Sequence, residues 1–179
     1  IIMAIKNAFK ELWIESHQRV VVSGVWCAWK ASQYIDWYAR ETLHGRAIPF
    51  AVGTKIANPE LTVMAMWWDW DGYGIWLGHF LHACKRDDDI TYIVFNNENY
   101  ALTTGQSSPT TPVWAKTKTA PNWNTSAPMD PIALALTAWA KFARKADSSK
   151  FAELKEIIKE AIQHKGFSLV DVTQACPSF

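Results

Sequence analysis

The spacing of apolar residues changes several times along this chain and divides it into alternating elements. Helical spacing predicts helices at residues 1–12, 48–57, 74–85, 130–146 and 148–165, and short apolar runs predict buried strands at 20–25, 61–66, 90–95 and 167–172. Pro59 and Gly166 are expected to end the helices that precede them. The chain starts inside the first predicted helix, without an initiator Met or a capping residue, so we expect that it is truncated at its N-terminus.

The alternation of strands with helices predicts an α/β fold in one domain over residues 1–179, with a mostly parallel sheet and helices on both faces. Ligands of such sheets bind in the crevice beyond the carboxyl ends of the strands. Residues 98–128 are rich in Thr, Ser and Pro and show no lasting apolar period. A loop of that length is unusual in a compact domain, so we expect it to be functional.

Charge and composition narrow the range of partners. The chain has 18 basic and 17 acidic side chains and a formal net charge of +1, so no strong field attracts nucleic acid or an anionic membrane. No apolar run reaches the roughly 18 residues of a membrane span, and the first residues lack the features of a signal peptide. We therefore expect a cytoplasmic protein with small-molecule or protein partners.

Two polar motifs follow predicted strands. Asp69 comes shortly after the run 61–66, and Asn97 shortly after the run 90–95. A carboxylate, an amide oxygen and a backbone carbonyl are hard ligands for a divalent cation, and Asp69, Asn97 and the carbonyl of Asn99 could supply them. A helix N-terminus near Gly72 would offer N–H groups to a phosphate. The alternative is that both motifs are ordinary solvated turns.

Longer motifs point to a family. They are Leu43-His44-Gly45-Arg46-Ala47-Ile48-Pro49, Asp69–Gly72, Asp89-Ile90-Thr91-Tyr92-Ile93-Val94, Asn96-Asn97, Thr104-Gly105-Gln106, Ser108-Pro109-Thr110, Lys116-Thr117-Lys118-Thr119 and Cys176-Pro177. With these motifs the chain resembles, along nearly its whole length, the thiamine-diphosphate-binding beta subunit of 2-oxoacid:ferredoxin oxidoreductases. The resemblance implies the thiamine-diphosphate-binding fold, a partner alpha subunit, and coenzyme A-dependent oxidative decarboxylation of a 2-oxoacid with reduction of ferredoxin. Overall likeness favours 2-oxoglutarate as the 2-oxoacid.

The same resemblance implies roles for individual residues. Three of them would hold Mg²⁺, namely Asp69, Asn97 and Asn99. Further contacts to thiamine diphosphate would come from Asp71, Gly72, Gly105 and Gln106. His44 and Arg46 would be catalytic residues that face the substrate carboxylate or the cofactor, and orienting its own loop is an equally plain role for His44.

The three cysteines divide into two groups. By resemblance, Cys27 and Cys176 would ligate a [4Fe-4S] cluster, which takes four thiolates, and the missing Cys pair is expected upstream of this chain. Cys84 has no role in the family and is interpreted as a core thiol. His79 and His82 share a helix face, but Cys84 is not on it, so we favour an ordinary core-facing helix over a metal site.

Tryptophan is more frequent than glycine in this chain, with 11 Trp against 8 Gly, which inverts the usual composition. All tryptophans except Trp37 fall where the family has, or readily accepts, glycine: Trp13, Trp26, Trp29, Trp67, Trp68, Trp70, Trp76, Trp114, Trp123 and Trp139. We predict that these are glycines in the cell, through a UGA codon read as glycine. The alternative is a genuine, inactive paralogue that serves as a structural partner of an alpha subunit.

Overall fold

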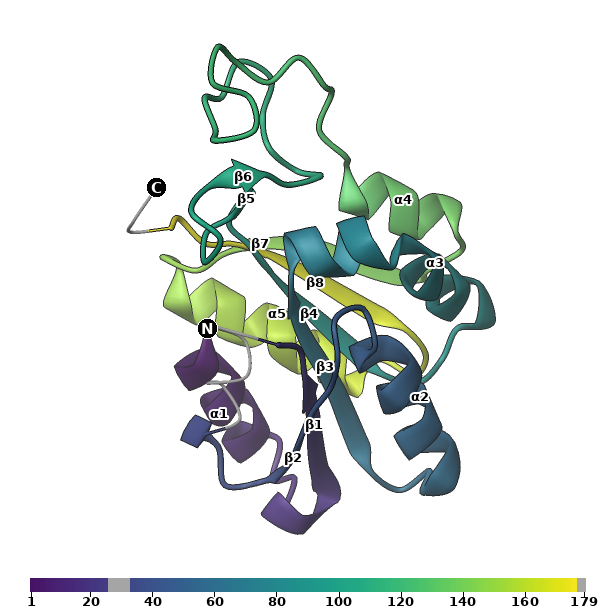
Figure 1. Ribbon diagram of the computed structural model, residues 1–179. Coiled ribbons are helices and arrows are strands. Elements are labelled where there is room, and N and C mark those ends of the chain that lie inside the picture. Colours follow the sequence, from purple (N-terminus) through teal and green to yellow (C-terminus); the bar gives the residue numbers. More distant parts are fainter. Residues whose placement is uncertain (26–32, 177–179) are drawn as a thin grey trace.

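The computed structural model describes residues 1–25 and 33–176 and contains a six-stranded sheet between two layers of helices (Figure 1). The main elements in chain order are α1 (Ile2–Glu11), β1 (Arg19–Ser23), β2 (Tyr38–Glu41), α2 (Ala47–Ala57), β3 (Thr62–Trp68), α3 (Leu77–Arg86), β4 (Thr91–Asn96), β5 (Asn99–Tyr100), β6 (Gln106–Ser107), α4 (Pro131–Thr137), β7 (Phe142–Asp147), α5 (Phe151–Gln163) and β8 (Ser168–Thr173). A 3-10 turn covers Ser16–Gln18, and a π-helical turn covers Trp70–Ile75.

All neighbouring strands of the main sheet are parallel, in the order β2-β1-β3-β4-β8-β7. The predicted α/β class is therefore confirmed. β5 and β6 pair with each other in a separate antiparallel hairpin. That hairpin belongs to the long loop at residues 98–128, in which the sequence shows no lasting apolar period.

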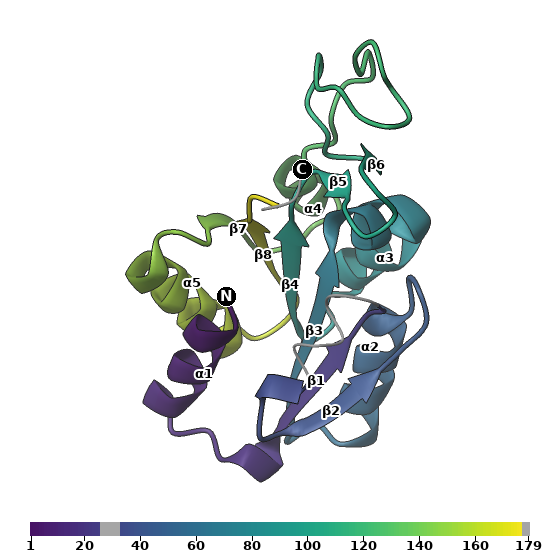
Figure 2. The ribbon, with the colours of Figure 1, turned by 60° about the vertical axis from the view of Figure 1, so that its left-hand side comes forward.

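The two faces of the sheet bury two separate apolar cores, because successive side chains of a strand point to opposite faces. Val20 of β1 and Val63 of β3 lie in the core with α2, α3 and α4, whereas Val21 and Met64 lie in the core with α1 and α5. Figure 2 shows the same division, with α1 and α5 on one side of the strands and α2 and α3 on the other.

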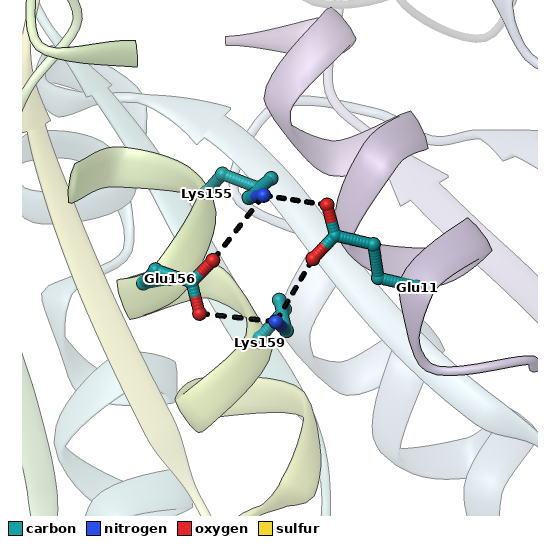
Figure 3. Close-up of polar contacts among 4 residues, drawn as sticks. All are labelled: Glu11, Lys155, Glu156 and Lys159. Carbon is teal, nitrogen blue, oxygen red and sulfur yellow. Dashed lines mark hydrogen bonds and ion pairs between the residues drawn. The ribbon is translucent and has the colours of Figure 1, made fainter. Parts of the chain in front are cut away.

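A ring of four alternating charges joins α1 to α5 at the surface (Figure 3). The Glu11 carboxylate of α1 accepts from Lys155 Nζ at 2.5 Å and from Lys159 Nζ at 2.9 Å. Glu156 closes the ring, at 3.3 Å from Lys155 and 3.0 Å from Lys159. The two lysines lower the pKa of Glu11 through these hydrogen bonds, the one from Lys155 most. Exposed pairs of this kind contribute little stability, so the buried face of α1 sets its position.

One predicted helix is wrong, and strand β2 and the short hairpin strands β5 and β6 were missed. The apolar spacing at residues 130–146 predicted a single helix, but α4 ends at Thr137 and the chain continues as strand β7. The residue that ends the helix is Trp139, which has a left-handed φ of 77° and carries no stop signal as a tryptophan. Strand β2 was missed because it is exposed along its whole length and shows no alternation. Within residues 1–25 and 33–176, no helix has the length and apolar character needed to cross a membrane.

The core beneath α1 and α5 yields a stability prediction. Ile158 is fully buried between α5 and the sheet, whereas its neighbour Ile157 is only partly buried. Ile158→Ala is expected to lower the free energy of unfolding by about 2–5 kcal/mol, because it leaves a cavity. Ile157→Ala is the matched control and should cost clearly less in the same urea titration. Equal losses would mean that α5 does not pack as described.

Candidate functional site

Polar residues gather at one edge of the sheet, because parallel strands bring all their carboxyl ends to the same side. Asp69 follows β3, Asn96 closes β4 and Asp171 lies near the end of β8, and these three strands are neighbours. The loop that carries β5 and β6 stands over this edge (Figure 1). The expectation that both polar motifs lie at carboxyl ends of neighbouring strands is confirmed.

Three oxygen-bearing groups meet at this edge and form an oxygen cluster: the side chains of Asp69 and Asn97 and the carbonyl of Asn99. The Asn97 amide nitrogen, in the orientation that satisfies its hydrogen bonds, donates to Asp69 Oδ1 at 2.9 Å and to the carbonyl oxygen of Asn99 at 2.8 Å. With the amide turned over, its oxygen would join the other two at the same spacing. Ligand oxygens of an octahedral Mg²⁺ at about 2.1 Å lie roughly 3 Å apart along each edge. The donor set and its spacing therefore fit the hard cation that the sequence predicted for these residues.

Asp69 is fully buried, and this burial raises its pKa to about 6. Hydrogen bonds from Ser108 and Thr110 oppose the rise, and the Thr110 hydroxyl lies 2.7 Å from Asp69 Oδ2. A bound divalent cation would reverse the effect of burial, because it stabilises the ionised form. Asp69 is thus a carboxylate whose environment suits it to a cation.

The π-helical turn after Asp69 holds Asp71 and Gly72. Asp71 is fully buried, its Oδ2 lies 3.0 Å from His44 Nδ1, and its Oδ1 has no hydrogen-bond partner among the described residues. Burial raises the pKa of Asp71 to about 6, against the effect of His44. A Cβ on Gly72 would overlap the hydroxyl of buried Tyr92, so this turn requires glycine there. π-Helical turns are rare and often occur at functional sites.

Arg46 directly precedes α2 and lies near a different part of this edge. Its guanidinium stacks 3.6 Å from the centre of the Trp76 ring, and its Nη1 lies 3.2 Å from His79 Nε2. Because a guanidinium can only donate, His79 accepts this bond as a neutral ring. Burial first, and the Arg46 charge second, lower the pKa of His79. His79 therefore holds Arg46 in place, while Cys84 is buried in the core and its pKa is raised to about 12.

The hairpin loop supplies the remaining predicted residues. Gly105 has a φ of 90°, and its backbone bonds to Tyr100 at 3.0 Å and to Lys118 at 2.7 Å hold the hairpin closed. Gln106 Oε1 accepts from the Thr103 hydroxyl at 2.5 Å. An open cleft is lined by Asn97, Asn99, Gly105, Lys118 and Cys176, among other residues of this loop. Cys176 thus lines the same cleft as Asn97 and Asn99, whereas Cys27 lies outside the described residues.

A buried hydrogen-bond chain behind the oxygen cluster was missed at the sequence level. Asp171, 1% exposed, accepts from the Tyr73 hydroxyl at 2.9 Å and from Asn96 Nδ2 at 3.2 and 3.1 Å. Asn96 Oδ1 in turn lies 2.9 Å from the Thr110 hydroxyl, which also contacts Asp69. The one available signal was a lone acid inside the apolar run 167–172.

Comparisons with known proteins found one matching family and several similar relatives. The family described as thiamine pyrophosphate enzyme, C-terminal TPP binding domain, matches residues 16–172. A 2-oxoacid:ferredoxin oxidoreductase subunit beta of Saccharolobus solfataricus is 43% identical over 181 residues, which cover 100% of this chain and 59% of the relative. The 2-oxoglutarate synthase subunit KorB of Archaeoglobus fulgidus is 42% identical over 177 residues, covering 99% of this chain and 64% of that relative.

A solved structure has nearly the same fold. It is the 2-oxoglutarate:ferredoxin oxidoreductase from Magnetococcus marinus with 2-oxoglutarate, coenzyme A and succinyl-CoA bound, with a TM-score of 0.96 and 35% identity over 99% of this chain and 61% of that one. The chain thus spans about 59% to 64% of the length of these relatives. The resemblance inferred from the sequence motifs is confirmed. The match over residues 16–172 shows that the chain belongs to the thiamine pyrophosphate enzyme family and carries its C-terminal cofactor-binding domain.

Proposed function

We propose that this chain is the thiamine-diphosphate-binding part of the beta subunit of a 2-oxoacid:ferredoxin oxidoreductase. The reaction is the coenzyme A-dependent oxidative decarboxylation of a 2-oxoacid to acyl-CoA and CO₂, with reduction of ferredoxin. The observation that carries the proposal is the oxygen cluster of Asp69, Asn97 and Asn99 at the carboxyl edge of the sheet. The relative from A. fulgidus is named a 2-oxoglutarate synthase, and the structure from M. marinus binds 2-oxoglutarate, which favours that substrate.

Different residues at this edge would bind Mg²⁺, the diphosphate of the cofactor and the substrate carboxylate. Asp69, Asn97 and the carbonyl of Asn99 would hold Mg²⁺, and Gly72 would let a diphosphate approach the backbone. When bound, thiamine diphosphate supplies the nucleophilic carbon and the electron sink for decarboxylation. The bond between His44 and Asp71 fixes the orientation of the imidazole ring, and Arg46 offers a positive charge to the substrate carboxylate. Gly105 and Gln106 would close the loop over the cofactor.

Electron transfer requires a second cofactor close to the first. Cys27 and Cys176 would supply two thiolates of a [4Fe-4S] cluster, and Cys176 borders the cleft that also exposes Asn97 and Asn99. A cluster held there would lie next to the thiamine site. The raised pKa of Cys84 makes it a poor thiolate, which favours its interpretation as a core residue. The complete enzyme would work in the cytoplasm with an alpha subunit, ferredoxin and coenzyme A.

A second candidate function is supported by the bulk of the side chains near Asp71. Trp67 and Trp76 line the small space that Asp71 and Gly72 also border. Indoles in that position would obstruct a diphosphate, as expected for an inactive paralogue that only assembles with an alpha subunit. Binding of thiamine diphosphate and Mg²⁺ by the complex with the alpha subunit distinguishes the two functions.

The oxygen cluster gives a direct test of the proposed site. Asp69→Asn is expected to weaken Mg²⁺-dependent thiamine diphosphate binding by the complex at least 100-fold in calorimetry, because it removes the charged ligand. The thermal stability without Mg²⁺ should be retained, since a buried carboxylate is itself costly. Asp147→Asn, which changes an acid at the carboxyl end of β7, is the matched control and should leave affinity unchanged. Wild-type affinity in Asp69→Asn would place the cation elsewhere.

The hydrogen-bond chain gives a second prediction. Asp171→Asn removes the charged acceptor that orients Asn96 and, through Thr110, Asp69. We expect Mg²⁺ affinity in the complex to fall about tenfold, which corresponds to roughly 1.4 kcal/mol. Tyr73→Phe removes the other donor to Asp171 and leaves the bonds from Asn96 intact, so its Mg²⁺ affinity should stay at the wild-type value. Equal effects of both variants would reduce Asp171 to a general packing role.

A further inference from the structure

Three tryptophans have a backbone conformation that suits glycine. Trp13, Trp114 and Trp139 have φ angles of 53°, 71° and 77°. In this left-handed region the Cβ of an L-residue crowds the following carbonyl oxygen, and glycine has no Cβ. A bulky residue there is an outlier that calls for an explanation.

Two of the three stand at the same position of the same helix-ending motif. After α1, Ile14 N donates to Phe9 O at 3.3 Å and Trp13 N donates to Lys10 O at 3.2 Å. These two bonds define a Schellman motif, whose left-handed residue is most often glycine.

The end of α4 repeats this pattern. Ala140 N donates to Ala135 O at 2.9 Å, and Trp139 N donates to Leu136 O at 3.0 Å. Trp139 therefore takes the position after α4 that Trp13 takes after α1. Two unrelated helix ends thus place tryptophan at the left-handed position where glycine is most often found; the same motif after α3 has Asp87 there, with a φ of 55°.

No burial of the indoles offsets this strain. Trp13, Trp114 and Trp139 are 84%, 70% and 80% exposed. An indole that remains in water gains little hydrophobic stabilisation. Trp13 and Trp139 thus have no buried packing role that would explain their presence, and Trp114 has a ring contact with the half-exposed Trp123 at 5.9 Å.

A second group of tryptophans crowds glycines or lacks polar partners near the proposed cofactor turn. The Trp67 ring lies so close to Gly24, and the Trp76 ring so close to Gly45, that a Cβ on either glycine would overlap the indole. Trp67 Nε1 is buried without a hydrogen-bond partner among the described residues. An unsatisfied buried donor is costly, so the indole at position 67 is poorly accommodated.

We infer that the protein made in the cell carries glycine at positions 13, 114 and 139. We infer the same for every other tryptophan position except Trp37, because a single cause would act on all of them. A single cause would be a UGA codon that the source organism reads as glycine. Trp37 is excluded because it is the one tryptophan that does not fall at a glycine position of the resembling family; its ring packs 4.5 Å from Phe9 and under the Arg19 guanidinium at 5.2 Å. The helix-end positions carry this inference independently of the proposed function; only the opening of the cofactor turn rests on that function.

The gene and the native protein decide the identity of these residues. We expect UGA at every tryptophan position except Trp37, which should have UGG. The intact mass of the native protein should be lower by the fixed Trp-to-Gly difference for each UGA codon. UGG codons throughout, or a native mass that retains all the indoles, would overturn the inference.

Stability measurements on the purified chain test the backbone argument by itself. Trp13→Gly and Trp139→Gly are each expected to raise Tm by roughly 2–4 °C. Trp13→Ala and Trp139→Ala remove the indole but keep Cβ, so they should give less of this increase. Trp37→Gly is the matched control and should lower Tm, because it removes a packed ring. A lower Tm in both helix-end glycine variants would contradict the inference.

A binding experiment separates this inference from the proposed function. A chain with glycine at all positions except Trp37, assembled with its alpha subunit, is expected to bind thiamine diphosphate and Mg²⁺ at least 100-fold more tightly than the tryptophan chain. If the helix-end glycines stabilise the fold but neither chain binds thiamine diphosphate and Mg²⁺, the proposed function fails and the glycine assignment stands. If the tryptophan chain binds equally well, the part of the inference that concerns the cofactor turn is wrong.

Discussion

The burial of the Asp69 carboxylate at the end of β3 is the constraint on which the rest of this edge depends. A carboxylate removed from water has to be stabilised by donors or by a cation. Thr110 and Asn97 reach it from the long loop and from the end of β4, and Asp171 of β8 reaches it through Asn96. The hydrogen bonds that solvate one acid therefore also anchor the loop over the three central strands.

The parallel sheet makes this convergence possible. A helix precedes each of β3, β4, β7 and β8, so residues far apart in sequence end at one edge. The same geometry explains why the buried strands were predictable: covered on both faces, β3, β4 and β8 appear as continuous apolar runs. Exposed β2 has no such run, and its place in the sheet depends on backbone pairing with β1 that composition does not reveal.

The candidate site was predictable only where the chemistry is local in sequence. Asp69, Asn97 and Asn99 follow strand ends, and parallel topology predicts that such ends meet. Thr110 and Asp171 were not predicted, because their contacts depend on how the loop folds back and on the register of β8. Thr110 stands in the motif Ser108-Pro109-Thr110, but that motif does not tell which acid its hydroxyl contacts. The residues that contact a predicted metal-binding residue are thus the part of the site that only the three-dimensional structure reveals.

The tryptophans could reflect loss of function or a codon that is read as glycine. The cofactor turn fits both explanations, and the helix ends distinguish between them. Loss of function would explain bulky residues near Asp71, since nothing there would need to admit a diphosphate. It gives no reason for Trp13 and Trp139, which are exposed, lie in Schellman motifs and touch no part of the site. The misread helix at residues 130–146 has the same origin, because glycine at Trp139 would have signalled its end. A cause that acts on glycine codons, and not on a binding site, accounts for both groups of positions.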